Sequence, residues 1–585
     1  MLVNRMRRIR AGNDDGFAMV LVIGFGLVLT LIVATLAEYT LMSVKTSRRD
    51  QHFHSSLAAA QAGVDDYLAR LNQNNTYWQS IDCTNVAMRK PTTGSNPCSW
   101  NSSTTPGWVT IPGSNDGDGG QCSSVPTPVN CPMYHYEVNT ATTPVNGTIT
   151  VTATGRSRGV TRTVQEVLRR VGFGDFLYFS DIEAVDPANP VYFGQNNQTA
   201  QTQCTRHYWD NPNRTSICKD ITFVAGDTFN GPLHTNDAML ISGNPTFNGP
   251  VSTAYPNCAP VGNTVPAASA CYRANGSANP TFAKGIAFAS KVDLPPNNAA
   301  IAAQVVPATA IGTPGCLYTG PTRIKFNSGG TMTVTSPYSL SLNPGCGTAP
   351  ITAAQTIPVP NNNVIVVQNV PSTQSSPSSS ASNCNNGGIY SAAIGYPQSG
   401  DYNTSFGLYN CRNGNVFVDG TLAGRVTISA DNNVVIVDNI TYAGGAAGTD
   451  ALGLIANNSV EVYHPISCSS TDSNGCSNGT NLARPTGGTW SSPVINAAMI
   501  SLLHSFGVQQ YHIGNPLGTL HVFGAISQKF RGAVGTFDSS GIDSGYVKDY
   551  SYDNRLRYSP PPFYLDPVQS SYARYTFGEV QGTVS

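Results

Sequence analysis

The sequence predicts a mostly β protein carried on one long N-terminal helix. Residues 17–37 are apolar and uncharged, and helix-favouring residues continue only to about residue 72. The whole chain has 57 Gly and 39 Pro, and the part beyond the helix is also rich in Asn, Ser and Thr, which favour turns and short strands. Short strand-and-turn units also recur. We therefore expect a β-helix-like solenoid ectodomain, with a β-sandwich carrying long loops as the alternative.

The first apolar segment is long enough to span a bilayer. A helix rises about 1.5 Å per residue, so residues 17–37 reach about 30 Å, more than a signal peptide needs. Arg5, Arg7, Arg8 and Arg10 precede the segment, and the positive-inside rule places them in the cytoplasm and the rest of the chain outside. The helix is expected to continue to residue 72 with one apolar face, formed by Leu57, Ala60, Gln61, Val64, Leu68 and Leu71.

The leader "MLVNRMRRIRAGNDDG" (1–16), the Gly16–Phe17 step and the apolar helix that follows together resemble the type IV pilin-like family. The resemblance implies that a prepilin peptidase cuts between Gly16 and Phe17. It also implies that the helix, with Phe17, Leu21, Leu27, Leu31 and Leu36, packs against other pilin-like subunits after leaving the membrane. Pilins usually carry Glu as the fifth mature residue, where this chain has Leu21. That departure indicates a minor subunit, low in copy number or at the tip, and an ordinary single-pass anchor is the alternative.

The region after the helix divides by composition into two expected parts. Residues 73–172 predict a small pilin-like head with stapled loops and two or three antiparallel strands. Residues 173–585 predict the large β-rich ectodomain, with a Ser-rich insertion at 371–388. "TFNGP" begins at Thr228 and again 18 residues later (246 − 228), and "NNNVIVVQN" (361), "DNNVVIVDN" (431) and "ANNSVEVYH" (456) echo one another. Such spacing is typical of coils that stack on one another. The Pro-rich segment "SPPPFYLDP" (559–567) is expected to be a rigid, extended cap that shields the open sheet edge at an end of the solenoid.

The chain has 14 cysteines, without a CxxC pair or a His cluster, so disulfides are expected rather than zinc. Reduced buried thiols are the alternative. The simplest of many connectivities joins sequence neighbours. These couples are Cys83/Cys98, Cys122/Cys131, Cys204/Cys218, Cys258/Cys271, Cys316/Cys346, Cys384/Cys411 and Cys468/Cys476.

Catalytic and metal signals are weak. No serine-hydrolase, zinc-protease, phosphate-loop or complete EF-hand motif occurs, so we expect a non-enzymatic protein without a cofactor. Asp116 and Asp118 form a Gly-rich loop that could hold a structural Ca²⁺, but a solvated turn is favoured because the distal Glu is missing. Asp419, Asp431 and Asp438 would have to converge for glycan hydrolysis, which sequence does not show.

The sequence thus predicts a single-pass membrane protein, with its C-terminus outside the cell, that is assembled into a surface pilus or pseudopilus as a minor subunit. Its ectodomain would serve adhesion, to a glycan or protein ligand, or the initiation of filament assembly. The net charge of −1 and the 11 % of charged residues give no indication of a nucleic-acid partner. The alternatives are a cell-surface carbohydrate-active enzyme on a β-helix and a plain membrane-anchored adhesin.

Overall fold

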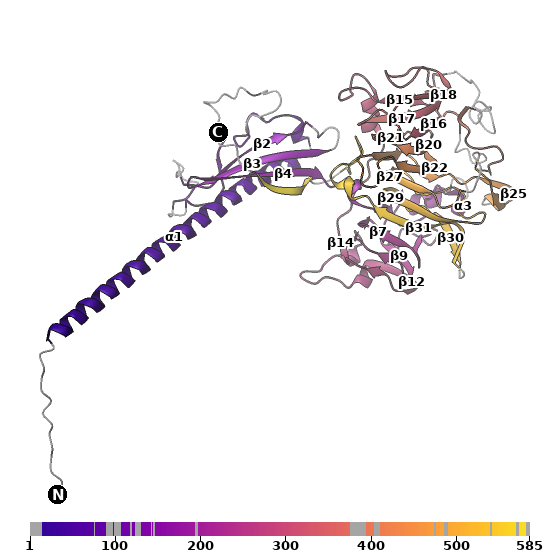
Figure 1. Ribbon diagram of the computed structural model, residues 1–585. Coiled ribbons are helices and arrows are strands. Elements are labelled where there is room, and N and C mark those ends of the chain that lie inside the picture. The colour runs from indigo at the N-terminus through magenta and orange to yellow at the C-terminus, as the bar shows by residue number, and fades with distance from the viewer. Residues whose placement is uncertain are drawn as a thin grey trace, which may run out of the picture. The chain divides into compact units, whose positions relative to one another are not determined.

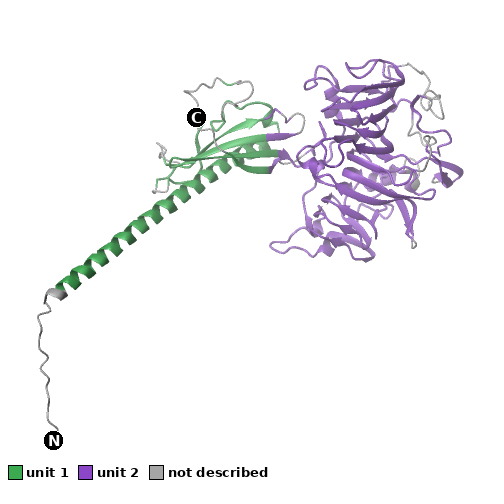
Figure 2. Ribbon diagram, viewed as in Figure 1, with its two compact units in different colours: residues 1–139, 150–168, 576–585 green, residues 140–149, 169–575 purple. Residues whose placement is uncertain are grey.

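The computed structural model contains a long helix, a small sheet and a large β-rich body (Figure 1). It describes residues 15–74, 76–88, 98, 107–116, 120–122, 130–141, 143, 147–193, 197–374, 393–402, 410–472, 475–484, 490–538, 541–568 and 572–580. The chain forms two compact units (Figure 2). Unit 1 comprises residues 1–139, 150–168 and 576–585, and unit 2 comprises residues 140–149 and 169–575.

Unit 1 begins with helix α1 (Asp15–Gln73), 59 residues long. No Pro interrupts it, and Ala and Leu are frequent along it. Its bounds enclose the range 17–72 expected from the sequence. Five strands form the sheet of this unit, in the order β1 (Val109–Thr110), β2 (Met133–Asn139), β3 (Thr148–Ser157), β4 (Val160–Arg170) and β32 (Tyr572–Val580).

The strands of this sheet agree with the expected head in part. β2 and β3 are antiparallel, as the alternation around the turn predicts. β3 and β4 are joined at Arg158 and Gly159, both with positive φ, as in a tight hairpin turn. The edge strand β32, however, comes from the end of the chain, so residues 576–585 belong to unit 1. The sequence-based boundary at residue 172 between the head and the ectodomain did not predict that the end of the chain belongs to the head.

Unit 2 is built on parallel strand ladders. We call the longest one ladder A. In stacking order it contains β15 (Cys316–Thr319), β19 (Asn363–Gln368), β21 (Arg425–Ala430), β23 (Ala451–Ala456), β27 (Val494–Ser501), β29 (Pro516–Phe530), β5 (Tyr178–Ile182), β8 (Leu233–Thr235), β11 (Val251–Thr253) and β14 (Ile286–Phe288).

Two further ladders share several of these strands. Ladder B runs through β16 (Thr322–Asn327), β20 (Val416–Leu422), β22 (Val434–Tyr442), β27, β29, β31 (Gly541–Tyr552), β7 (Thr228–Asn230), β10 (Thr246–Phe247) and β13 (Thr281–Phe282). Ladder C runs through the first parts of β16, β20 and β22, then β24 (Val460–Val462) and β28 (Phe506–Val508). A separate parallel sheet contains β6 (Thr222–Phe223), β9 (Met239–Gly243) and β12 (Tyr272–Ala278).

Shorter elements decorate these ladders. The antiparallel pairs include β17 (Thr331–Ser336) with β16 and with β18 (Ile351–Pro358), β25 (Ile466–Asp472) with β26 (Gly475–Asn481), and β30 (Gly535–Asp538) with β31. The short helices are α3 (Pro190–Phe193), α4 (Gln198–Gln203) and α5 (Ala299–Ala302). The single-turn 3₁₀ helices are η1 (Tyr77–Gln79), η2 (Phe173–Asp175), η3 (Pro256–Cys258), η4 (Ala268–Cys271), η5 (Ala303–Val305) and η8 (Asn554–Arg557).

The core of unit 2 is made of like residues stacked along the ladders. Phe229, Phe247 and Phe282 occupy one column, with ring centroids 5.5 Å and then 5.0 Å apart. Thr228 pairs with Thr246 in the same register, so the two copies of "TFNGP" lie on neighbouring parallel strands. Such columns bury the apolar side chains of one strand against those of the next.

The three asparagine-rich repeats do not all lie in the same ladder. Val434 of the second echo pairs with Val460 of the third, so these two units are neighbours in ladder C. The first echo instead supplies β19, which lies in ladder A and pairs with β15 and β21. Its unbroken apolar run, Val364 to Val367, is buried on both faces of the strand.

The outer face of ladder A is covered by the Pro-rich segment "SPPPFYLDP" (559–567). Arg425 Nη2 donates to the carbonyl of Pro560 at 2.6 Å, and the hydroxyl of Thr427 donates to the carbonyl of Pro562. The prediction that this segment caps an end of the solenoid is wrong, because Pro560 and Pro562 contact β21, a strand inside ladder A. Val364, Ile455 and Ile500 face outward in ladder A and need an apolar cover, which Leu565 helps to supply.

Candidate functional site

The N-terminal half of α1 is an exposed apolar surface. Gly16 and Phe17 lie in its first turn, whereas leader residues 1–14 lie outside the described residues. The side chains expected to mediate assembly are exposed: Leu21 by 45 %, Leu27 by 59 %, Leu31 by 57 % and Leu36 by 58 %. The helix is long and apolar enough to cross a membrane.

The threonine hydroxyls within this apolar half donate hydrogen bonds to backbone carbonyls of the helix itself. Thr30 Oγ1 donates to the carbonyl of Gly26 at 2.9 Å, and Thr35 Oγ1 donates to the carbonyl of Leu31 at 3.0 Å. Hydroxyls bonded in this way need no water. The surface can therefore be covered by lipid or by another helix without leaving a hydroxyl unpaired.

The C-terminal half of α1 packs on the sheet of unit 1. Its buried stripe is Ser56, Ala59, Ala60, Val64, Tyr67 and Leu71. Ala60, Val64 and Leu71 were predicted, while the other predicted residues of the stripe are half-buried. The backbone of Gly155 on β3 lies so close to the helix that a Cβ there would be 2.2 Å from the carbonyl oxygen of Ser56.

A small polar cluster fixes this packing. The Tyr136 hydroxyl donates to Asp66 at 2.6 Å and accepts from Asn85 Nδ2 at 2.7 Å, and Arg70 Nε donates to Asp66 at 3.0 Å. Burial and the neighbouring Asp66 carboxylate raise the pKa of Tyr136 well above its usual range. Tyr136 therefore remains a neutral donor that ties β2 to α1.

The described residues include disulfides between sequence neighbours. They are Cys83–Cys98, Cys122–Cys131, Cys204–Cys218, Cys258–Cys271, Cys316–Cys346 and Cys468–Cys476. These six couples are joined as the simplest connectivity predicts.

The seventh expected couple, Cys384/Cys411, differs from the other six because only one of its members is described. Cys411 is buried and disulfide-bonded. Cys384 lies outside the described residues, as do residues 375–388 of the Ser-rich insertion. The alternative of a reduced buried thiol is therefore wrong for Cys411, whereas its pairing with Cys384 stays a prediction.

Of the three acids considered for glycan hydrolysis, Asp419 and Asp438 lie close enough on the paired strands β20 and β22 to interact electrostatically. Asp419 on β20 is ion-paired with Arg323, and Asp438 on β22 is 2.6 Å from Arg484 Nη1. Asp431 lies at the corner after β21, where it accepts hydrogen bonds from the Asn369 backbone and the Asn298 side chain. These carboxylates hold strands and corners together.

The acidic loop is closed by its own hydrogen bonds. Asp116 Oδ1 accepts from the Gly120 backbone at 2.7 Å, and Asp118 lies outside the described residues. Across the residues that the structure describes, no three His, Cys, Asp or Glu side chains gather as metal ligands.

A cavity of about 310 Å³ in unit 2 is the feature that the sequence did not predict. Its lining includes Asn432 and Asn458 from the Asn-rich corners, Glu461 on β24, and His504 and Gln509 on either side of β28. The sequence contained only a partial signal, since Asn residues recur before β20, β22 and β24, three of the strands of ladder C. Glu461 and His504 are isolated in the sequence and gave none.

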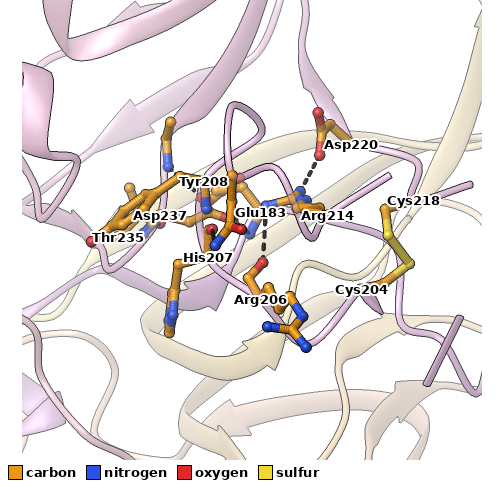
Figure 3. A network of polar contacts seen from close by, with 12 residues as sticks. Glu183, Cys204, Arg206, His207, Tyr208, Arg214, Cys218, Asp220, Thr235 and Asp237 are labelled. Carbon is orange, nitrogen blue, oxygen red and sulfur yellow. Dashed lines mark hydrogen bonds and ion pairs between the residues drawn. A yellow bond between two sulfur atoms is a disulfide. The ribbon is translucent and has the colours of Figure 1, made fainter. Parts of the chain in front are cut away.

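One wall of this cavity belongs to residues 184–221, which connect β5 to β6. Cys204–Cys218 closes this connection internally, and Asp237 anchors it (Figure 3). The Asp237 carboxylate accepts from Arg214 Nη1 at 2.6 Å and from the backbones of Tyr208 at 2.5 Å and Glu183 at 3.0 Å.

The same anchor continues into the ladder strands. Arg531 Nη1 lies 3.1 Å from Glu183 Oε2, and both side chains are almost fully buried. Burial raises the pKa of Glu183 against the opposing effect of Arg531. Removing one partner of such a buried pair leaves the other charge without compensation and strongly destabilises the folded protein. The pair therefore holds the start of the 184–221 segment in one position.

The fold therefore defines a protein with one apolar N-terminal helix and a large β-rich ectodomain. Residues 135–258, less than half of the chain, match the family described as "Domain of unknown function (DUF4900)". A solved structure, the competence-associated pilin ComZ from Thermus thermophilus, is 12 % identical, covering 90 % of this chain and 97 % of that chain. Its TM-score of 0.26 does not establish a shared fold. No curated protein matches.

Proposed function

We propose that this chain is a non-enzymatic minor pilin-like subunit, inserted in the membrane by α1 before assembly into a pilus or pseudopilus. The observation that carries the proposal is the division of α1 into two halves. Residues 19–37 form an uncharged, apolar and exposed segment, whereas the stripe from Ser56 to Leu71 is buried on the unit 1 sheet. A helix of this kind anchors a folded head and leaves its other half for lipid or for neighbouring helices.

The exposed half needs a cover for energetic reasons. Burying one Leu side chain stabilises a structure by about 1.5–3 kcal/mol, and many such residues are exposed here. Gly26, Thr30 and Ala34 are spaced four residues apart, so they lie on one face and allow a second helix to approach closely. Leu21 puts no charge into this interface, which agrees with the minor-subunit role that the pilin resemblance implies.

The ectodomain in this proposal is a β-helix-like solenoid. From Val416 to Ala456 the chain passes through ladders C, B and A and then through the three again in the same order. The ladders are parallel, unlike the antiparallel sheets of a β-sandwich. A stack of this type would project from the filament, for adhesion or for starting assembly.

The experiment is mass spectrometry of the mature N-terminus in a host with a prepilin peptidase. The expected product begins at Phe17, and Gly16→Val should leave the leader attached. Gly24→Val is the matched control, because a Cβ at Gly24 meets nothing within 4 Å. An intact leader on the wild-type chain would instead support a plain membrane anchor.

Assembly is tested by placing a photo-crosslinking residue at Leu27 or Leu31 in the membrane-inserted chain. Crosslinks to other helix-bearing subunits are expected from these positions. The same residue at Phe577, which is exposed on β32, is the control and should give few. Crosslinks to lipid alone under conditions of filament growth would contradict the assembly role.

A further inference from the structure

The unassigned cavity in unit 2 has three polar walls. Asn432 and Asn458 form the first wall, Glu461 and Gln509 the second, and Asp186 with His504 the third. Its volume of about 310 Å³ is at the lower end of the range for small-ligand sites, about 300–1,000 Å³. The site is large enough for a small polar molecule or for one end of a longer chain.

The first wall is a ladder of side-chain amides with a fixed direction. Asn432 Nδ2 donates to Asn415 Oδ1 at 2.6 Å, and Asn458 Nδ2 donates to Asn432 Oδ1. Asn433 Oδ1 accepts from the Ser459 backbone at 3.0 Å, which holds the same two corners together. Because these hydrogen bonds already fix the amides, a ligand that binds them does not have to order their side chains.

The second and third walls combine an acid with a hydrogen-bonding partner. Gln509 Nε2 donates to Glu461 Oε2 at 2.6 Å, and His504 Nδ1 lies 2.7 Å from Asp186 Oδ2. Burial raises the pKa of Glu461, while Asp186 raises the pKa of His504 despite its burial. The walls therefore offer both donors and acceptors within one small space.

The charge of the lining excludes several ligand classes. Its two basic side chains already face carboxylates, Arg531 opposite Glu183 and His504 beside Asp186. A phosphate or sulfate would find no uncommitted cation among these described lining residues. Glu461 already accepts a hydrogen bond from Gln509, and a cationic ligand would have to compete with that bond. Side-chain amides and carboxyl oxygens instead suit hydroxyl groups, which both donate and accept.

We propose that this cavity binds a neutral carbohydrate, namely one or two sugar units of a glycan. Apolar side chains in the lining, Val185, Ile221 and Val508 with the ring of Tyr511, would contact the C–H faces of the sugar. The inference deepens the proposed adhesive role of the ectodomain and rests on it for its biological meaning. The binding chemistry itself depends only on unit 2.

The test uses the full chain in a detergent without a sugar headgroup. Saturation-transfer NMR and calorimetry are run with maltotriose, cellotriose and N,N′,N″-triacetylchitotriose, and with trigalacturonate as the anionic comparison. Millimolar or tighter binding of at least one neutral probe is expected. Asn458→Ala and Gln509→Ala should each weaken that binding at least tenfold in protein that thermal melts show to be folded at the temperature of the binding experiment.

Gln198→Ala removes an exposed amide on α4 and is the matched control, with no change in binding expected. Absence of binding by all three neutral probes at about 20 mM would overturn the proposal, as would binding that survives both cavity substitutions. Stronger binding of trigalacturonate would overturn the ligand class. Failure here leaves cleavage at Gly16 untouched, so it is distinguishable from failure of the pilin-like role.

Discussion

The side-chain amide of Gln528 donates a 2.6 Å hydrogen bond to the hydroxyl of Tyr178, 350 residues earlier in the chain. Gln528 lies on β29 and Tyr178 on β5, and these strands are parallel neighbours in ladder A. The chain thus enters unit 2 in the middle of the stack and runs outward to β14. The chain then continues at β15, which lies at the opposite end of ladder A. From there it runs back along the ladder until β29 pairs with β5, the first strand of unit 2 in this ladder.

This meeting point should be sensitive to a change at Gln528. Its Oε1 accepts from the backbones of Phe506 and Gly532, each at 3.0 Å, and the side chain is fully buried. Gln528→Leu would leave these two N–H groups unpaired, so the unfolding free energy should fall by about 3 kcal/mol. Urea titration measures this loss. The exposed Gln198→Leu is the control, and an equal effect of both variants would refute the account.

The close approach of α1 to β3 predicts a large effect of a single methyl group. Gly155→Ala would place a Cβ 2.2 Å from backbone atoms of Ser56 and Ala60, neither of which can rotate away. We expect destabilisation of unit 1 by about 2 kcal/mol or more and faster proteolysis of residues 56–71. Gly329→Ala, where a Cβ meets nothing within 4 Å, should be close to neutral. Wild-type protease resistance of Gly155→Ala would contradict the packing.

The anchor of the 184–221 segment predicts a contrast between a buried arginine and a partly exposed one. Arg214 is 3 % exposed and Asp237 is fully buried, so Asp237→Asn should cost about 3 kcal/mol. Arg273→Ala removes the more exposed partner of Asp220, which keeps its ion pair with Arg214, and should cost less than about 1 kcal/mol. Thermal melts measure both, and limited proteolysis should detect opening of the segment only in Asp237→Asn. Similar losses in the two variants would argue against a buried anchor.

His234 predicts acid sensitivity of unit 2. It is 1 % exposed between Ser252 and Asn236, and burial lowers its pKa from 6.5 to about 4. Between these values the unfolded chain binds the proton and the folded chain does not. The stability contributed by neutral His234 is therefore complete above pH 6.5 and falls as the pH drops toward 4, by about 3 kcal/mol in total.

Urea midpoints at pH 7.5, 6 and 4.5 measure this dependence. His234→Gln should show a flatter loss of stability over that interval than the wild type. His521→Gln changes an exposed histidine on β29 and should keep the wild-type slope. A wild-type slope in His234→Gln would show that other groups cause the acid sensitivity.

Local patterns in the sequence were enough to locate several elements. The helical spacing of Ala60, Val64 and Leu71 identified one face of α1, and the "TFNGP" repeat identified two neighbouring strands of ladder B. Both features arise from interactions between residues close in sequence, so their period is visible in a single chain. The same reasoning misplaced "SPPPFYLDP", because an end of a stack and its flank both require an apolar cover.

The amino-acid sequence by itself determined the long helix, its apolar first half and the β-rich character of the rest, because these follow from helix length and residue periodicity. Only the tertiary structure decided that β29 pairs with β5, that β32 joins the head, and that Glu461, His504 and Asn458 share one cavity. Parallel neighbours in a stacked fold can come from any distance along the chain. No local period therefore encodes which strands and corner residues finally meet.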